Sequence, residues 1–166
     1  MMSLKKIALI LFFMMLLTMG VASAEIRHEE DTAANKTTIR SDNYVSESVD
    51  FISLFKTVTS NSAQYKIVAE KRTIKDFAFT KTFIELQIDE NPVHMLEVGE
   101  VVTTPTVSSV LFWFSVDAPV PEEMINELKA AKKVTLRFQR VDDYSPVVVL
   151  PDNILAEWKE VINTEK

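Results

Sequence analysis

Residues 107–133 read VSSVLFWFSVDAPVPEEMINELKAAKK, and this stretch decides the fold. Its first part, residues 110–116, carries apolar side chains at both parities, which predicts a strand whose two faces are both covered. Its second part, about residues 121–132, has acidic residues at its start and lysines at its end, which complement the dipole of a helix. The stretch therefore predicts a buried strand that leads into an amphipathic helix.

Pro119 and Pro121 stand between the two parts. Proline suits the first turn of a helix, where no backbone donor is missed, so we expect both prolines there. Met124, Ile125 and Leu128 then form one apolar stripe at helical spacing. That stripe must pack against something, and a sheet is the available partner.

The aromatic run Phe112-Trp113-Phe114 has two interpretations. One is a stacking platform for a sugar or a nucleic acid, and the other is a hydrophobic core. We expect the core, because aromatic side chains dominate core burial. Trp158 stands at helical spacing within a second apolar stripe, residues 152–163, and is also expected in the core rather than as a ligand stacker.

Most of the remaining chain has the patterns of strands and turns. Residues 49–58 fit a helix or a strand, but their β-branched end favours a strand that forms a hairpin with residues 64–71. Further strand-like segments are residues 37–45, 84–88, 93–98, 134–139 and 147–150, with a bulge or bend at 80–82. We expect an α+β fold: a mainly antiparallel sheet or sandwich with two amphipathic helices, about 121–132 and 152–163, packed on it.

The N-terminus has the features of a secretory signal peptide. Two lysines precede an apolar run, residues 7–19, which is too short to span a bilayer comfortably, and Ala22-Ser23-Ala24 follows. We expect cleavage after Ala24, which assigns residues 1–24 to the signal peptide. The alternative is an uncleaved membrane anchor.

After the signal peptide we expect two parts. Residues 25–36 are polar and acidic and form an N-terminal arm, either loose or folded as a short strand that turns back. Residues 37–166 have a length that suits a single globular domain.

Composition narrows the location and the partners. The chain has no cysteine, hence no disulfide, and its formal charge is −6. An acidic chain disfavours nucleic acid and anionic lipid as partners. We expect a secreted or periplasmic protein of bacterial type, with no membrane span after signal cleavage. Its expected partner is an envelope or extracellular protein or a small ligand.

One group of residues has metal-ligating chemistry, namely Asp89, Glu90, His94 and Glu97. However, His94 and Glu97 have opposite parity on a strand and so point to different faces. The spacing also matches no zinc or calcium loop. We expect a solvated turn and no metal site.

Asp142 and Asp143 are the best candidates for a catalytic acid pair. Adjacent side chains in a turn diverge, and aspartate is an ordinary turn residue, so we expect no catalysis there. His28 and His94 are the only histidines that could activate a serine nucleophile. Gly99 is the only glycine after the signal peptide, which excludes Gly-rich phosphate loops. We therefore expect no catalytic residue and no cofactor.

These observations favour an exported non-enzymatic module that has a binding or structural role at the cell envelope or outside the cell. Two alternatives stay open. One is a small exported hydrolase or metal-dependent enzyme, which would need His94 or an acid pair to converge in a pocket. The other is a periplasmic carrier that holds a small ligand between sheet and helices.

Overall fold

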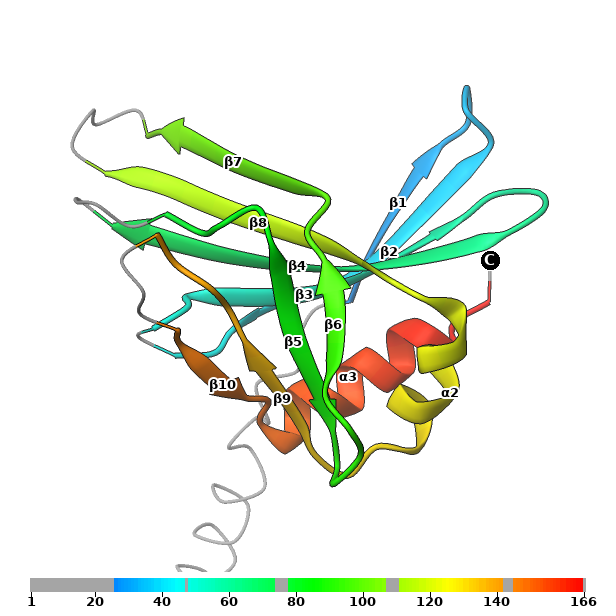
Figure 1. The fold of residues 1–166 in the computed structure, drawn as a ribbon. Coiled ribbons are helices and arrows are strands. Elements are labelled where there is room, and N and C mark those ends of the chain that lie inside the picture. Colours follow the sequence, from blue (N-terminus) through cyan, green and yellow to red (C-terminus); the bar gives the residue numbers. More distant parts are fainter. Residues whose placement is uncertain (1–25, 47, 74–77, 107–110, 142–144, 166) are drawn as a thin grey trace, which may run out of the picture.

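The computed structural model describes residues 26–46, 48–73, 78–106, 111–141 and 145–165. Within them the chain forms two antiparallel sheets and two helices, and both helices lie on the same side of the larger sheet (Figure 1). The expected α+β fold with a mainly antiparallel sheet and two packed helices is therefore confirmed.

The larger sheet, called sheet A, has six strands in the order β1-β2-β3-β4-β8-β7. The strands are β1 (Ile26–Asp31), β2 (Lys36–Tyr44), β3 (Phe51–Val58), β4 (Ala63–Thr73), β7 (Glu100–Pro105) and β8 (Phe112–Val120). The predicted hairpin is the β3–β4 pair, so residues 49–58 contain a strand and no helix. Residues 26–31 form the short strand that turns back, pairing with β2.

The smaller sheet, called sheet C, has four strands in the order β10-β9-β5-β6. They are β5 (Phe83–Ile88), β6 (His94–Glu97), β9 (Val134–Arg137) and β10 (Val147–Val149). The predicted bend at residues 80–82 precedes β5, beside the isolated bridge between Phe79 and Arg140. The chain passes from sheet C to sheet A between β6 and β7, where Gly99 lies.

The helices are α2 (Glu122–Ala130) and α3 (Asp152–Asn163), close to the expected ranges. Helix α3 packs on β2 and β3, while β6 of sheet C packs against β8, so one side of sheet A is covered along its middle strands. The apolar stripes of both helices join a single core, in which Trp158 is 0% exposed. Its burial confirms the prediction that Trp158 is a core residue.

Pro119 corrects one prediction. It lies in β8, paired with Lys66 of β4, and only Pro121 directly precedes α2. The strand tolerates this proline because β7 pairs with β8 only as far as Asp117, so the missing backbone donor has no partner strand on that side.

Lys56 is a charged side chain in the interior, where only 7% of it is exposed. Its ammonium group donates hydrogen bonds to the carbonyl oxygens of Ile162, at 2.9 Å, and Thr164, at 2.7 Å. These carbonyls belong to the end of α3, where the helix leaves acceptors without partners and carries partial negative charge. Burial lowers the pKa of Lys56, the nearby Lys129 adds to the effect, and Glu165 opposes it.

Three predictions fall outside the described residues. They are the signal peptide with its cleavage after Ala24, the first residues of the stretch 107–133, and the pair Asp142 and Asp143. Neither described helix is long and apolar enough to cross a membrane.

Candidate functional site

The side of sheet A that faces away from the helices is called the open face. Its alternate side chains from β2, β3, β4, β7 and β8 are partly or fully exposed, except that of Ser53. Trp113 lies on this face, whereas its neighbours Phe112 and Phe114 point to the opposite side, where Phe114 is buried. The expectation that both faces of this strand are covered, and that Trp113 belongs to the core, is therefore wrong.

Trp113 stacks against a cation from the neighbouring strand. The guanidinium carbon of Arg72 lies 3.9 Å from the centre of the Trp113 ring and 5.0 Å from that of Phe51. Arg72 and Trp113 are partners in the β4–β8 register, and Phe51 comes from β3 on the other side of β4. Three strands thus hold one exposed arginine between two aromatic side chains, a favourable arrangement for a planar cation.

The same pattern recurs one step along the sheet. The Phe55 ring has Arg40 of β2 on one side and Lys66 of β4 on the other, each 5.5 Å from its centre. Arg40 also pairs with the carboxylate of Asp42 at 3.2 Å. Lys66 pairs with Asp117 at 3.0 Å. The cations around Phe55 are therefore already neutralised by carboxylates.

Glu70 is the titratable group at the centre of this face. Burial raises the pKa of Glu70 above its ordinary value, and the negative charge of Asp42 raises it further. A hydrogen bond from the Trp113 side chain and the positive charges of Arg72 and Arg40 act in the opposite direction. The result is a half-buried carboxyl group that holds its proton to higher pH than an exposed glutamate.

Two pockets meet at Trp113 and Glu70. The first, called the arginine pocket, has a volume of about 360 Å³. The second, called the threonine pocket, has a volume of about 470 Å³ and lies towards β7. The arginine pocket is lined by Arg27, Arg40, Asp42, Phe51, Ser53, Phe55, Glu70, Arg72 and Trp113. The threonine pocket is lined by Glu70, Thr104, Pro105, Thr106, Trp113 and Ser115.

The two pockets differ in chemistry. Arg72 covers the β4 side of the indole, and Thr104, the register partner of Trp113 in β7, stands on the other side. The threonine pocket offers small side chains and a proline beside the indole. The arginine pocket instead concentrates charged groups. A ligand long enough to cross Trp113 would meet a largely apolar surface and then a polar one.

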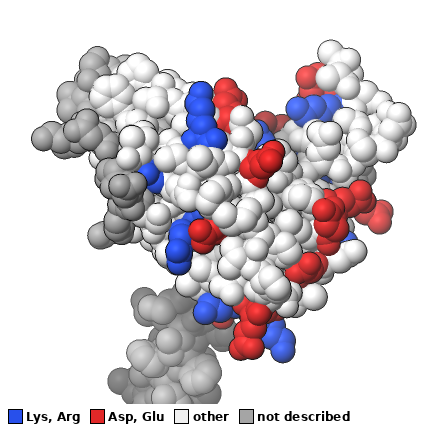
Figure 2. All heavy atoms as spheres, in the orientation of Figure 1, with Lys and Arg blue, Asp and Glu red and all other residues white. Residues whose placement is uncertain are grey.

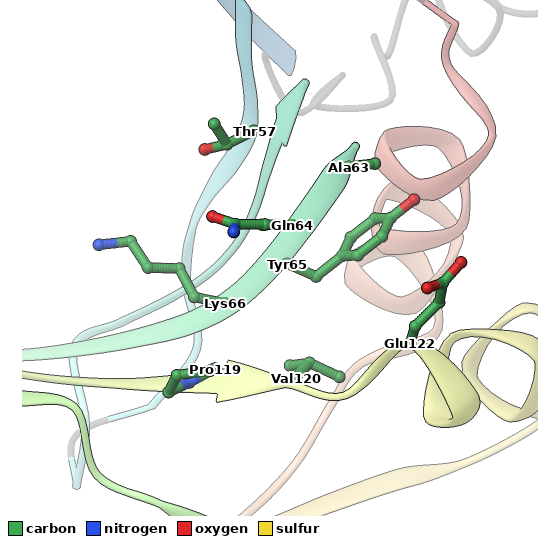
Figure 3. Close-up of a pocket in the computed structure, with 8 residues that line it drawn as sticks. All are labelled: Thr57, Ala63, Gln64, Tyr65, Lys66, Pro119, Val120 and Glu122. Carbon is green, nitrogen blue, oxygen red and sulfur yellow. The ribbon is translucent and has the colours of Figure 1, made fainter. Parts of the chain in front are cut away.

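A third pocket, of about 410 Å³, lies at the ends of β4 and β8 (Figure 3). Tyr65 points towards the helices there, on the same side as Glu122, while Lys66 points the other way. Burial raises the pKa of Tyr65, and the charge of Glu122 adds to this. Glu122 and Lys66 are the charged groups of its lining, and Lys66 is already paired with Asp117. The arginine pocket of the open face therefore offers a ligand more charged and aromatic side chains than this third pocket does.

The metal candidate around the β5–β6 turn has other contacts. The Asp89 carboxylate accepts hydrogen bonds from the backbone N–H groups of Lys132, at 2.8 Å, and Lys133, at 2.7 Å. His94 Nε2 lies 3.5 Å from the Glu127 carboxylate of α2. Within the described part of the chain, no group of three or more potential ligands is arranged to hold a metal ion.

No protein-family model matches this chain, and no curated protein and no solved structure shows significant similarity to it. The site must therefore be interpreted from its own geometry.

Sequence reasoning missed this site, although one signal was present. Residues 64–72 alternate, and their polar side includes Lys66, Glu70 and Arg72. This side of β4 faces the same way as Trp113, because Arg72 and Trp113 are register partners in adjacent strands. Knowing that these two strands pair would have indicated that Trp113 lies on the solvated face.

Proposed function

We propose that this protein is an exported, non-enzymatic binding module whose open face binds a glycan. The observation that carries the proposal is the position of Trp113 between two pockets on a solvated sheet face. The C–H faces of a sugar ring stack well on an exposed aromatic side chain. The carboxylates, arginines and hydroxyls around Trp113 supply the hydrogen-bonding partners that sugar hydroxyls need.

The location of the site favours a glycan over a peptide. An extended peptide usually binds a sheet at its edge, where free backbone groups can pair with it. The central strands of the open face, β4 and β8, have sheet partners on both sides, so their backbone groups are already engaged. A ligand on this face therefore meets side chains, aromatic rings and hydroxyls.

The decisive experiment is a binding screen of the purified protein on a glycan array, followed by calorimetric titration of any glycan that binds. We expect binding to at least one class of glycan and a loss of at least tenfold in affinity for Trp113→Ala. Met95→Ala is the matched control, because Met95 is 52% exposed on the other sheet, and it should bind normally. Absence of binding to every glycan, or normal binding by Trp113→Ala, would overturn the proposal.

One observation favours a second candidate, a glycoside hydrolase. Two carboxyl groups whose environments differ are a common catalytic pair, and the raised pKa of Glu70 beside Asp42 fits a general acid. However, Asp42 is occupied by Ser53 Oγ at 2.9 Å and by Arg40 at 3.2 Å. Prolonged incubation with each bound glycan separates the two functions. Cleavage that is lost in Glu70→Gln would establish the hydrolase instead of the binding module.

A further inference from the structure

The arginine pocket differs in charge from the protein that contains it. Three arginines face two carboxyl groups in its lining, which gives a formal charge of +1 when both carboxyls are ionised. The whole chain has a formal charge of −6. On the face drawn in Figure 2, basic and acidic side chains are both dispersed over the surface. Glu29, outside the lining, also pairs with Arg40 at 3.2 Å, so the positive charge left for a ligand lies at Arg72. Such a cation favours a negatively charged ligand group.

Arg72 is the arginine placed to contact such a group. Its guanidinium carbon lies 3.9 Å from the centre of the Trp113 ring and 5.0 Å from that of Phe51, and the guanidinium group carries five N–H donors. Among the described residues, no carboxylate lies within 4.0 Å of these donors, whereas Arg27 and Arg40 both pair with Asp42. The contacts with two aromatic rings also restrict the guanidinium group, so less conformational freedom is lost when it binds an anion.

We infer that the arginine pocket binds a carboxylate group of the glycan, with Arg72 as the residue that contacts it through two parallel hydrogen bonds. This inference rests on the proposed function and specifies its ligand as an acidic glycan. In this arrangement a neutral sugar ring occupies the threonine pocket against Trp113, and the carboxylate of an adjoining sugar reaches Arg72. Arg–carboxylate pairs of this kind combine geometric specificity with strong, charge-assisted hydrogen bonds.

The neighbouring carboxyl groups favour a singly charged carboxylate over a phosphate monoester, which carries up to two negative charges. A sulfate ester carries one charge, as a carboxylate does, and the sulfated glycans of the test below separate the two. Arg27 and Arg40 are already paired with Asp42, so Arg72 is the cation left to neutralise one negative charge. The second charge of a phosphate dianion would lie uncompensated beside Asp42. Glu70 adds a second reason. Because burial raises the pKa of Glu70, its protonated form can donate a hydrogen bond to an incoming carboxylate. A ligand that binds here can thus share that proton.

The test uses an array that carries neutral glycans together with carboxylated, phosphorylated and sulfated ones. We expect retention only on carboxylated glycans, and a drop of at least tenfold when the carboxylate of a bound glycan is converted to its methyl ester. Arg72→Gln should weaken binding about ten- to a hundredfold, as expected for loss of hydrogen bonds to a charged group. Arg137→Gln is the matched control, because Arg137 also lies exposed on a strand, paired with Glu85 at 3.4 Å, but on sheet C.

The outcomes separate this inference from the proposed function. Binding to neutral glycans that depends on Trp113 but not on Arg72 overturns the acidic ligand and leaves the glycan module standing. Retention only on phosphorylated or sulfated glycans overturns the choice of carboxylate. Equal binding of the free acid and its methyl ester does the same. Absence of retention on every glycan overturns both proposals.

Discussion

The two sides of sheet A carry the same residue types in opposite roles. Beneath the sheet, Trp158 of α3 is fully buried, and Lys56 is buried with its ammonium group on the end of that helix. On the open face, Trp113 is partly exposed under a stacked arginine, and Lys66 pairs with Asp117 at the surface. The comparison shows that residue type does not decide whether a side chain is buried in the core or faces the solvent. The strand partners decide it.

The largest expected difference between the two sides concerns the tryptophans. Trp158→Ala should lower the free energy of unfolding by about 3–5 kcal/mol, because it leaves a large cavity in the core. Trp113→Ala should lower it by about 1–2 kcal/mol, since the side chain is only partly buried and loses its contact with Arg72 and its hydrogen bond to Glu70. Urea denaturation followed by circular dichroism measures both. Equal losses would mean that Trp113 is structural, and the distinction between the two sides would fail.

The lysines should show a smaller difference in the same direction. Lys56→Ala removes two hydrogen bonds to carbonyls at the end of α3 and the packing of the buried stem, so we expect a loss of about 2 kcal/mol. Lys66→Ala removes an exposed ion pair and should change stability by about 0.5 kcal/mol. Denaturant unfolding of the two variants at one salt concentration provides the comparison. A loss for Lys66→Ala as large as that for Lys56→Ala would contradict it.

A double-mutant cycle sharpens the description of the open face. Arg72→Ala, Trp113→Ala and the double variant should give a coupling energy of about 0.5–1 kcal/mol, the range for an exposed cation over an aromatic ring. The coupling should persist at high salt more than that of the Lys66–Asp117 pair, because screening acts most strongly on exposed ion pairs. Additive effects of the two substitutions would show that the stacked geometry does not persist in solution.

The smallest expected effect is the pH dependence contributed by Glu70. Its pKa is raised in the folded chain, so the folded state holds this proton more tightly than the unfolded state. The resulting stabilisation is complete below the ordinary pKa of 4.5 and is lost as the pH rises through the raised value. Glu70→Gln should therefore gain stability relative to the parent chain over that pH range and then hold a constant difference. A difference that does not vary with pH would contradict this.

The sequence predicted the positions of the helices and strands better than it predicted which of their side chains are buried. Helices α2 and α3 were predictable because a preceding proline, an acidic first turn and an apolar stripe are all local signals. The strand character of residues 51–58 was also predictable, from their β-branched end. By contrast, the exposure of Trp113 depends on β4, which pairs with β8 from a distant part of the sequence, and on which side of the sheet is covered.

The candidate site could not be predicted for the same reason. Phe51, Arg72 and Trp113 lie on three different strands, and nothing in the local pattern of any one strand indicates that their side chains meet. Pro119 gives a second example. Its position within β8 is acceptable only because the pairing of β7 with β8 ends at Asp117. The residues next to the proline in the sequence do not reveal where that pairing ends.

Gly99 has a consequence for the mutational tolerance of the whole open face. A Cβ atom at this position would lie 2.7 Å from Asp117 Oδ1. That oxygen accepts a hydrogen bond from the backbone N–H of Glu100 at 2.8 Å, and Oδ2 of the same carboxylate holds Lys66. Any larger residue must displace this carboxylate, which also holds Lys66 beside Phe55. In a saturation library, substitutions at position 99 should therefore be poorly tolerated, because they disturb the Asp117 contacts with Lys66 and with the backbone of Glu100.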